Sequence, residues 1–203
     1  MKIFKNGLAT GLVLQLAIGP VFFYIINLTL QKSIFDGLAG AVGVMLGDYT
    51  YIALSILGIG KLLEHRKIKK VFGVISSIVL IIFGLAILRS VIGVHLSTIT
   101  IISSNPLISF VSALLLTLSS PLTIVLFTSV FTAKTLEYNF SKKELILFGL
   151  GTGSATFIFM AASVIIFSFI KGAVPVLIIQ ILNSVVGCLL IVYGGIRSVK
   201  VLK

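Results

Sequence analysis

Long runs of apolar residues separated by short basic stretches dominate the pattern of the sequence. Six of these runs are long enough to cross the hydrocarbon core of a bilayer, which takes about 20 residues of α-helix. They cover residues 7–30, 37–62, 71–88, 107–132, 145–170 and 174–196. No stretch between them is long and polar enough for a soluble domain. The pattern therefore predicts an all-α integral membrane protein with six transmembrane helices in a single transmembrane domain over residues 1–203.

A proline interrupts two of these runs near the middle. Gly19-Pro20 interrupts the first run and Ser120-Pro121 interrupts the fourth. Because proline lacks a backbone donor and its ring clashes with the preceding turn, each pair should kink or break its helix. Such backbone is tolerated at membrane depth only where it faces protein or a water-filled cavity. Matching breaks in two halves of a chain are typical of a transporter's binding site, so we expect the two pairs to meet near the midplane.

The composition agrees with a membrane protein. Hydrophobic residues make up 58% of the 203 residues and charged residues 10%, and the mean hydropathy is +1.24. Soluble domains carry about 25% charged residues. The net charge of +11 would suggest a nucleic-acid partner in a soluble protein. Here the basic residues lie between apolar runs, so we expect a lipid bilayer as partner and no nucleic acid. The single cysteine, Cys188, excludes an internal disulfide.

The distribution of basic residues predicts the orientation. All 16 of them except Lys32, Arg89 and Lys171 fall on the side that both termini share in a six-span chain. By the positive-inside rule, both termini are expected in the cytoplasm, in a bacterial-type plasma (inner) membrane. Lys2 and Lys5 before the first run imitate a signal peptide, but the run is too long for one. We expect an uncleaved first span.

A weak internal repeat divides the chain into two halves. Residues 80–84 (LIIFG) in the third run resemble residues 190–194 (LIVYG) in the sixth, and Arg89 or Arg197 follows each motif. Together with the two proline breaks, this predicts one repeat over about 1–95 and another over about 105–203. An odd number of spans in each half makes the two repeats inverted.

Asp48 is the only carboxylate that falls deep inside an apolar run. The other acidic residues lie at run ends or in connections: Asp36, Glu64, Glu137 and Glu144. A carboxylate near the bilayer centre costs about 2.5–3.5 kcal/mol on insertion scales, so it normally faces a cavity or a partner. One interpretation is a site for proton coupling or for a substrate amine. The alternative is a hydrogen-bonded Asp that fixes helix packing.

Polar residues beside the breaks are candidates for substrate binding. Broken helices expose backbone amides and carbonyls that can hold the carboxylate and the ammonium group of a zwitterion. The predicted binding residues lie at the breaks or on the polar stripe around Asp48: Gln15, Gly19, Pro20, Tyr51, Ser119, Ser120, Pro121 and Thr123. The fifth run carries a patch of small and polar residues from Gly149 to Thr156, for which we favour close helix packing.

The remaining polar residues favour no metal, cofactor or enzyme. His65 and His95 lie in connections expected on opposite sides, and neither has Cys or acidic neighbours at metal spacing. Residues 151–154 (GTGS) could suggest the serine loop of an intramembrane protease. No histidine falls inside a run to act as its base, so we expect no enzyme.

The sequence resembles the lysine exporter (LysE/RhtB) family of amino-acid efflux transporters. The motifs that carry the resemblance are Gly11-Leu12, Gly19-Pro20, Gly37-Leu38, Gly43, Gly47-Asp48 and Gly58 in the first half, and Ser120–Ile124 followed by Phe127 and Phe131 in the second. The two repeat motifs resemble that family's third and sixth spans. The chain departs from the family pattern at Val21 and Ser120, where the family often has Asn.

The resemblance implies export of amino acids or related small solutes from the cytoplasm. The chain has no nucleotide-binding loop, so an inward proton, in antiport, is the simplest energy source. Two alternatives stay open: an exporter of metal ions or small cations from the wider superfamily, and a membrane assembly factor without transport activity. A homo-oligomer is compatible with the sequence.

Overall fold

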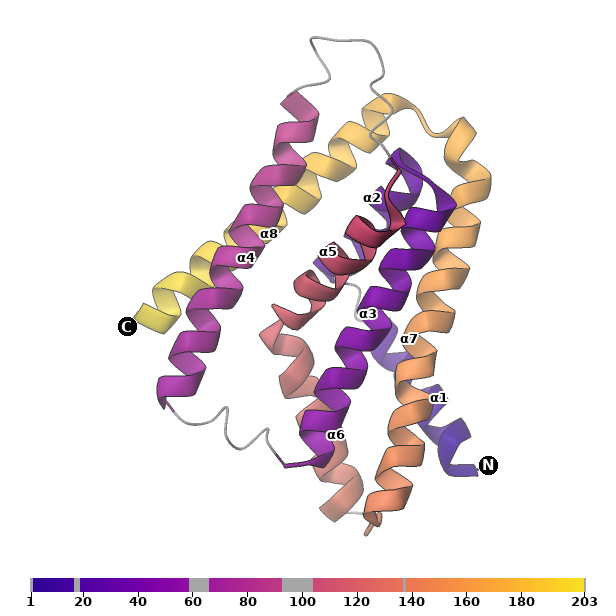
Figure 1. The fold of residues 1–203 in the computed structure, drawn as a ribbon, viewed down its shortest axis with the longest axis vertical. Helices are drawn as coiled ribbons and strands as arrows, with labels where there is room; N and C mark the ends of the chain where they lie inside the picture. Colours follow the sequence, from indigo (N-terminus) through magenta and orange to yellow (C-terminus); the bar gives the residue numbers. More distant parts are fainter. Residues whose placement is uncertain (1, 17–18, 59–65, 93–103, 137, 203) are drawn as a thin grey trace.

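The computed structural model describes residues 2–16, 19–58, 66–92, 104–136 and 138–202, and every structural statement below refers to them. Their regular structure is entirely helical, as the sequence predicts (Figure 1). The helices are α1 (Lys2–Gln15), α2 (Pro20–Gln31), α3 (Ile34–Ile56), α4 (Arg66–Ile92), α5 (Pro106–Leu118), α6 (Pro121–Leu136), α7 (Lys142–Ile170), the 3-10 turn η3 (Lys171–Ala173) and α8 (Val176–Leu202). Glu64, Glu137, His65, His95 and the side chain of Arg197 lie outside the description.

Both predicted breaks are present. Helices α1 and α2 meet at 83°, and the fourth apolar run bends by 64° between α5 and α6. Pro20 and Pro121 are the first residues of α2 and α6. Proline favours this position because its missing N–H would have no intrahelical partner there. The prediction that the first and fourth runs break at their prolines is confirmed.

The number of membrane-spanning helices among the described residues depends on how the bent pairs are counted. Three helices of the described residues are long and apolar enough to cross a membrane, and the count rises to five if each bent pair forms one span. The third predicted run is present only as a shorter apolar helix, Gly73–Arg89 within α4. The basic residues that precede it and Arg89 at its end limit its apolar length. Six spans therefore remain a prediction.

Glycines let three pairs of helices approach closely. On α1, a Cβ at Gly7 would collide with the Phe148 carbonyl of α7. On α3, a Cβ at Gly43 would lie 2.5 Å from the Phe110 carbonyl oxygen of α5. On α4, a Cβ at Gly84 would lie 2.8 Å from the Gly187 carbonyl oxygen of α8. Small residues are common at helix contacts in membranes for this reason.

Asp36 joins the start of α3 to the start of α5. Its carboxylate is fully buried and accepts hydrogen bonds from Ser104 Oγ (2.5 Å), Ser109 Oγ (2.7 Å), Ser33 Oγ (2.6 Å) and the Asn105 N–H (3.2 Å). The sequence indicates an acid at the end of a run but not this cradle. A carboxylate with several donors around it can remain buried without a cation.

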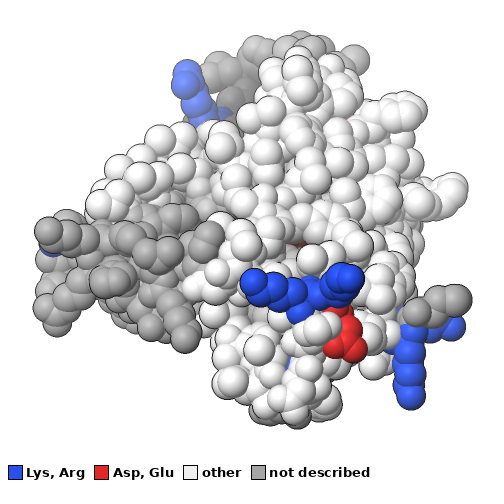
Figure 2. Space-filling view, turned by 60° about the horizontal axis from the view of Figure 1, so that its bottom comes forward, with Lys and Arg blue, Asp and Glu red and all other residues white. Residues whose placement is uncertain are grey.

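Several basic residues of the described part of the chain lie together at one end of the bundle. Lysines of α1, α6 and α7 (Lys2, Lys5, Lys134, Lys142 and Lys143) lie at the lower end in Figure 1. Figure 2 looks toward that end and shows a few blue basic side chains and one red acidic patch among the white atoms of the described surface. Large apolar side chains on α4, α7 and α8 face outward, among them Ile82, Ile166 and Ile181. Such a surface is typical of a protein surrounded by lipid.

Candidate functional site: a cavity between the two broken spans

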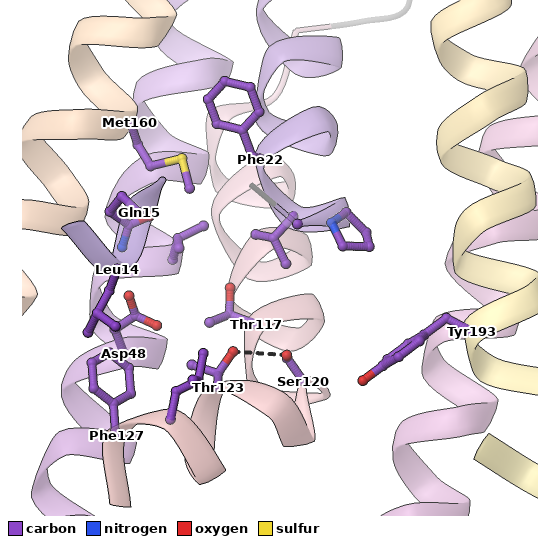
Figure 3. A pocket seen from close by; sticks show the side chains of 15 residues that line it. Leu14, Gln15, Phe22, Asp48, Thr117, Ser120, Thr123, Phe127, Met160 and Tyr193 are labelled. Carbon is purple, nitrogen blue, oxygen red and sulfur yellow. Dashed lines mark hydrogen bonds between the residues drawn. The ribbon is translucent and has the colours of Figure 1, made fainter. Parts of the chain in front are cut away.

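A cavity of about 220 Å³ lies where the two broken pairs approach α3, α7 and α8. Figure 3 shows the labelled side chains converging on it, with Tyr193 of α8 facing the others across the opening. The lining residues are Leu14, Gln15, Gly19, Pro20, Val21, Phe22, Val44, Asp48, Thr117, Ser120, Thr123, Leu126, Phe127, Met160 and Tyr193. No lysine or arginine is among them.

Most of the residues predicted from sequence border this one cavity. They are Gln15, Gly19, Pro20, Asp48, Ser120 and Thr123. Pro121 begins α6 directly after Ser120, and its side chain is not described. The other two, Tyr51 and Ser119, do not line the cavity. Thus the structure brings both breaks and the intramembrane carboxylate together.

Tyr51 and Ser119 instead satisfy carbonyl groups at the end of α5. The Tyr51 hydroxyl donates to the Leu118 carbonyl, and Ser119 Oγ donates to the Leu115 carbonyl at 2.7 Å. The Leu115 carbonyl also accepts from the Ser119 N–H at 3.0 Å. The Leu118 carbonyl belongs to the last residue of α5, and the last carbonyls of a helix have no intrahelical donor, so a break inside a membrane needs a partner such as Tyr51. Both residues therefore fix the shape of the break rather than border the space beside it.

Four helix ends surround the cavity. The first turns of α2 and α6 reach it through Pro20 and Thr123, and the last turns of α1 and α5 reach it through Gln15 and Thr117. A helix carries partial positive charge at its N-terminus and partial negative charge at its C-terminus. The cavity thus offers places for both an anionic and a cationic group. Any side chain added at Gly19 would meet open space, because nothing lies within 4 Å of its Cβ position.

A chain of hydrogen bonds holds Asp48. Thr156 Oγ1 donates to Asp48 Oδ2 at 2.7 Å, and Gln15 Nε2 donates to Thr156 Oγ1 at 2.7 Å. Asp48 is 4% exposed and Thr156 is fully buried. The chain joins α3, α7 and the end of α1, just before the first break. A carboxylate held this way can keep its position while it accepts or loses a proton.

The rest of the cavity wall is mainly apolar and includes Phe22, Val44 and Met160. Its polar groups include the Ser120 and Thr123 hydroxyls, which form a 2.9 Å hydrogen bond at the lower edge in Figure 3. Pockets for drug-sized ligands occupy about 300–1,000 Å³. The smaller volume here suits a solute of few atoms that carries one or two polar groups and an apolar part.

Sequence reasoning did not assign several of these residues to the site. Thr156 was grouped with the glycines around it as a packing patch, and those glycines do pack: Gly151 lies against α1 and Gly153 against the Tyr49 ring. Phe22, Met160 and Tyr193 carry no signal in a chain so rich in apolar residues. The spacing of Thr152 and Thr156, one helical turn apart, places two hydroxyls on the same face of α7, and this could have indicated a polar face there.

A scan against protein-family models decides the family. The model for the LysE type translocator matches residues 12–196, nearly the whole sequence. The chain belongs to the LysE type translocator family. No curated protein and no solved structure matched the chain.

Membership in the LysE type translocator family makes this a multi-pass membrane transporter with a small-molecule substrate and membrane lipid around it. The resemblance inferred from the sequence motifs is thereby confirmed. In the part of the translocator that the structure describes, no three His, Cys, Asp or Glu side chains come together as a metal ion would require. The absence of catalytic activity stays a prediction.

A second polar cluster of the LysE type translocator lies between α2 and α8. Asn27 Nδ2 donates to Asn183 Oδ1, and Gln31 Nε2 donates to Asn27 Oδ1 (2.6 Å) and Asn183 Oδ1 (2.7 Å). Asn27 and Asn183 are buried. The cluster lies along the same two helices that carry Phe22 and Tyr193 to the cavity. No local pattern in the sequence predicts this cluster.

Proposed function

We propose that the protein exports amino acids or related small solutes from the cytoplasm in exchange for protons. The observation that supports this most is that both helix breaks and Asp48 border a single cavity. Inside a membrane, an ionisable residue is expensive unless it has a function or a partner. Non-helical backbone is likewise expensive unless it lines a cavity. One binding site explains both features.

The proposed substrate lies with its ammonium group toward Asp48. Its carboxylate faces the first turns of α2 and α6, where the partial positive charge of each helix and the Ser120 and Thr123 hydroxyls favour an anion. Its side chain lies against Phe22, Val44 and Met160. Because the wall offers no second acid and no basic side chain, the geometry favours an apolar or small polar amino acid.

Asp48 is the proposed proton carrier. A proton taken up from outside neutralises the carboxylate and weakens its attraction for the substrate ammonium, so the solute leaves. Release of the proton to the cytoplasm restores the negative charge, and the next solute binds. One proton enters as one solute leaves, which couples export to the proton gradient without nucleotide hydrolysis.

An inverted repeat of two three-helix halves is the proposed frame for this exchange. Three observations support it. Helix α1 packs on α7 as α5 packs on α3. Gly43 and Gly151, which face the Phe110 and Phe4 carbonyls, each precede a site residue by five positions. Gly84 and Gly194, the last residues of the two sequence motifs, each face a backbone carbonyl of the partner helix. In this inverted repeat, Asp48 and Thr156 occupy corresponding positions of the two halves, and their side chains are hydrogen-bonded to each other.

The proposed orientation places both termini in the cytoplasm of a bacterial-type inner membrane. The lysines of α1, α6 and α7 gather at one end of the bundle, which supports this orientation by the positive-inside rule (Figure 2). Solutes then enter from that end. Rocking of the halves about the cavity exposes it to the two sides in turn.

Efflux of solutes from proteoliposomes tests the proposal. Vesicles loaded with single labelled amino acids would be given an inward proton gradient, and efflux would be compared with that of protein-free vesicles. We expect efflux of apolar or small amino acids that the inward proton gradient accelerates and that slows when an ionophore removes the gradient. If no amino acid is transported and the proton gradient instead drives efflux of a small inorganic cation, the ion-exporter alternative is favoured.

A further inference from the structure

A second hollow lies on the outer surface between α3 and α7, away from the cavity. Its volume is about 310 Å³, and its lining is almost entirely apolar. The lining residues are Tyr49, Ile52, Ala53, Ile56, Leu57, Ile146, Gly149 and Leu150. It follows α3 from Tyr49 to Leu57, which at 1.5 Å per residue corresponds to about 12 Å along the helix. We call it the α3–α7 groove.

The floor and one end of this groove are fixed by close packing. Gly149 forms the floor, because a Cβ there would lie 2.6 Å from Ile52 Cγ2 and 3.3 Å from Phe131 Cζ. The Tyr49 hydroxyl hydrogen-bonds to the Leu150 carbonyl and to Ser154 Oγ, both at 3.1 Å. The ring is therefore held against α7 and presents an apolar edge to the groove.

The other end of the groove opens beside positive charge. Lys142 precedes Ile146, Gly149 and Leu150 by four, seven and eight residues, so the four lie on one face of α7. Side chains on a helix point toward its N-terminus, so the Lys142 ammonium lies beyond the apolar lining. Lys143 is its exposed neighbour.

Glu144, the acid nearest to these two lysines in sequence, offsets only one of their two positive charges, so this end keeps a net positive charge. Glu144 Oε2 accepts hydrogen bonds from the Ser141 N–H and from Ser141 Oγ, both at 2.8 Å, and so caps α7. An apolar groove with positive charge at its membrane-surface end is complementary to one kind of molecule, an amphiphile with an anionic head and an acyl chain. Basic residues beside transmembrane helices attract anionic lipid head groups in this way.

We propose that the α3–α7 groove binds an anionic phospholipid, with one acyl chain in the groove and the phosphate at Lys142 and Lys143. The site is independent of the transport cavity. It would hold together α3 and α7, the two helices that carry Asp48 and Thr156. A second copy of the protein could instead occupy the groove, and the experiment must distinguish it from the phospholipid.

The protein has no tryptophan, so a single introduced one reports on its own surroundings. Leu57→Trp places it at the mouth of the groove, where Leu57 is 71% exposed. Val125→Trp, at an exposed position on α6, is the control. Each variant would be reconstituted in phosphatidylcholine containing a small fraction of brominated phosphatidylglycerol or brominated phosphatidylcholine, and the quenching would be compared.

We expect brominated phosphatidylglycerol to quench Leu57→Trp several-fold more effectively than brominated phosphatidylcholine, and the two lipids to quench Val125→Trp equally. Adding Lys142→Gln or Lys143→Gln should weaken the preference by about fivefold for each lysine that contacts the phosphate, since each is worth about 1 kcal/mol. Adding Ala53→Phe should fill the groove and abolish the preference, whereas Ala162→Phe, exposed on α7 beyond the groove, should not.

Equal quenching of Leu57→Trp by the two lipids would overturn the proposal, as would a preference that survives Ala53→Phe. Chemical cross-linking of the unmodified protein that traps a dimer, lost in Ala53→Phe but not in Ala162→Phe, would assign the groove to a second copy. Gel filtration and thermal unfolding check that each variant is folded. If Ala53→Phe is not, the lysine variants alone decide, because they lie on the exposed surface.

Discussion

Thr156 Oγ1 donates a 2.7 Å hydrogen bond to Asp48 Oδ2 and accepts one from Gln15 Nε2. A hydroxyl has one proton to donate, so this arrangement uses it on the carboxylate and leaves the oxygen as acceptor for the amide. The bond links α3 to α7, and through Gln15 it reaches the end of α1. Asp48 is therefore connected by hydrogen bonds to the helix that leads into the first break.

Asp48→Asn should abolish efflux driven by a proton gradient while leaving the protein folded. The asparagine keeps the size of the side chain and an oxygen that can accept from Thr156, but it cannot carry a proton. Exchange of labelled for unlabelled substrate without a gradient should persist only at higher substrate concentrations, because the neutral side chain no longer attracts the substrate ammonium. Both assays use the same proteoliposomes over a range of pH.

Glu144→Gln is the matched control for this prediction. It neutralises a carboxylate in the first turn of α7, far along the helix from Thr156. It should leave transport unchanged. If Asp48→Asn exports normally and with the same pH dependence, Asp48 is a packing residue. No other carboxylate lines the described cavity to replace it in the coupling.

Thr156→Val should destabilise the protein by about 1–3 kcal/mol, the usual cost of leaving buried polar partners without a hydrogen bond. Valine matches the shape of threonine but leaves Asp48 and Gln15 without their shared partner. Thr156→Ser keeps the hydroxyl and serves as the control. Thermal unfolding in detergent measures the first effect. A pH profile of transport that differs for Val but not for Ser would identify a role in positioning Asp48.

The helix breaks and Asp48 could be predicted from sequence because their signals are local. Proline acts on its own turn, and a carboxylate in an apolar run is visible without a fold. Thr156 lies 108 residues from Asp48, and its neighbours already explain it as packing. The sequence predicts Tyr51 as a binding residue on the polar stripe around Asp48, whereas its hydroxyl donates to the Leu118 carbonyl outside the cavity lining, because residue spacing gives the helix face and not the partner. The burial of Asp36 depends on Ser104, Asn105 and Ser109, which no local pattern connects to it.

Asn183→Ala should destabilise the contact between α2 and α8. It removes the acceptor for Asn27 and Gln31, which lie 156 and 152 residues away in sequence. Asn27 then lies buried without that partner, and we expect a loss of about 1–3 kcal/mol in unfolding free energy. Ser184→Ala, on the next position of α8, removes only a bond to its own helix, to the Gln180 carbonyl. Equal unfolding temperatures for the two variants would contradict this.

The orientation can be tested with reporter fusions. Fusions after Lys70, Lys143 and Lys203 should report the cytoplasm, and fusions near Lys32 and Lys171 should report the outside. A fusion near Thr98, outside the described residues, should also report the outside. The charge bias is the physical reason, since basic loops resist translocation. A cytoplasmic signal at Thr98 would contradict both the six-span count and the inverted repeat.

Pro20→Ala and Pro121→Ala should impair transport more than expression. Alanine restores the backbone N–H and removes the ring clash, so each broken pair can approach a continuous helix. A straighter first or fourth span would withdraw the first turn of α2 or α6 from the cavity. Initial rates of gradient-driven efflux, divided by the amount of folded protein, measure the loss. Pro106→Ala, at the first residue of α5 and outside the breaks, is the control and should transport normally.

Cross-linking tests the geometry that this prediction assumes. Gly19 and Ser120 line the same cavity, so cysteines at these two positions should be joined by a short bifunctional reagent in membranes. Cys188, the one native cysteine, would first be replaced by serine. Substrate that occupies the cavity should slow the reaction, whereas a solute that is not transported should not. If the two cysteines fail to react in every condition while each reacts with a small thiol reagent, the two breaks do not share a site, and the proposed binding mode fails with them.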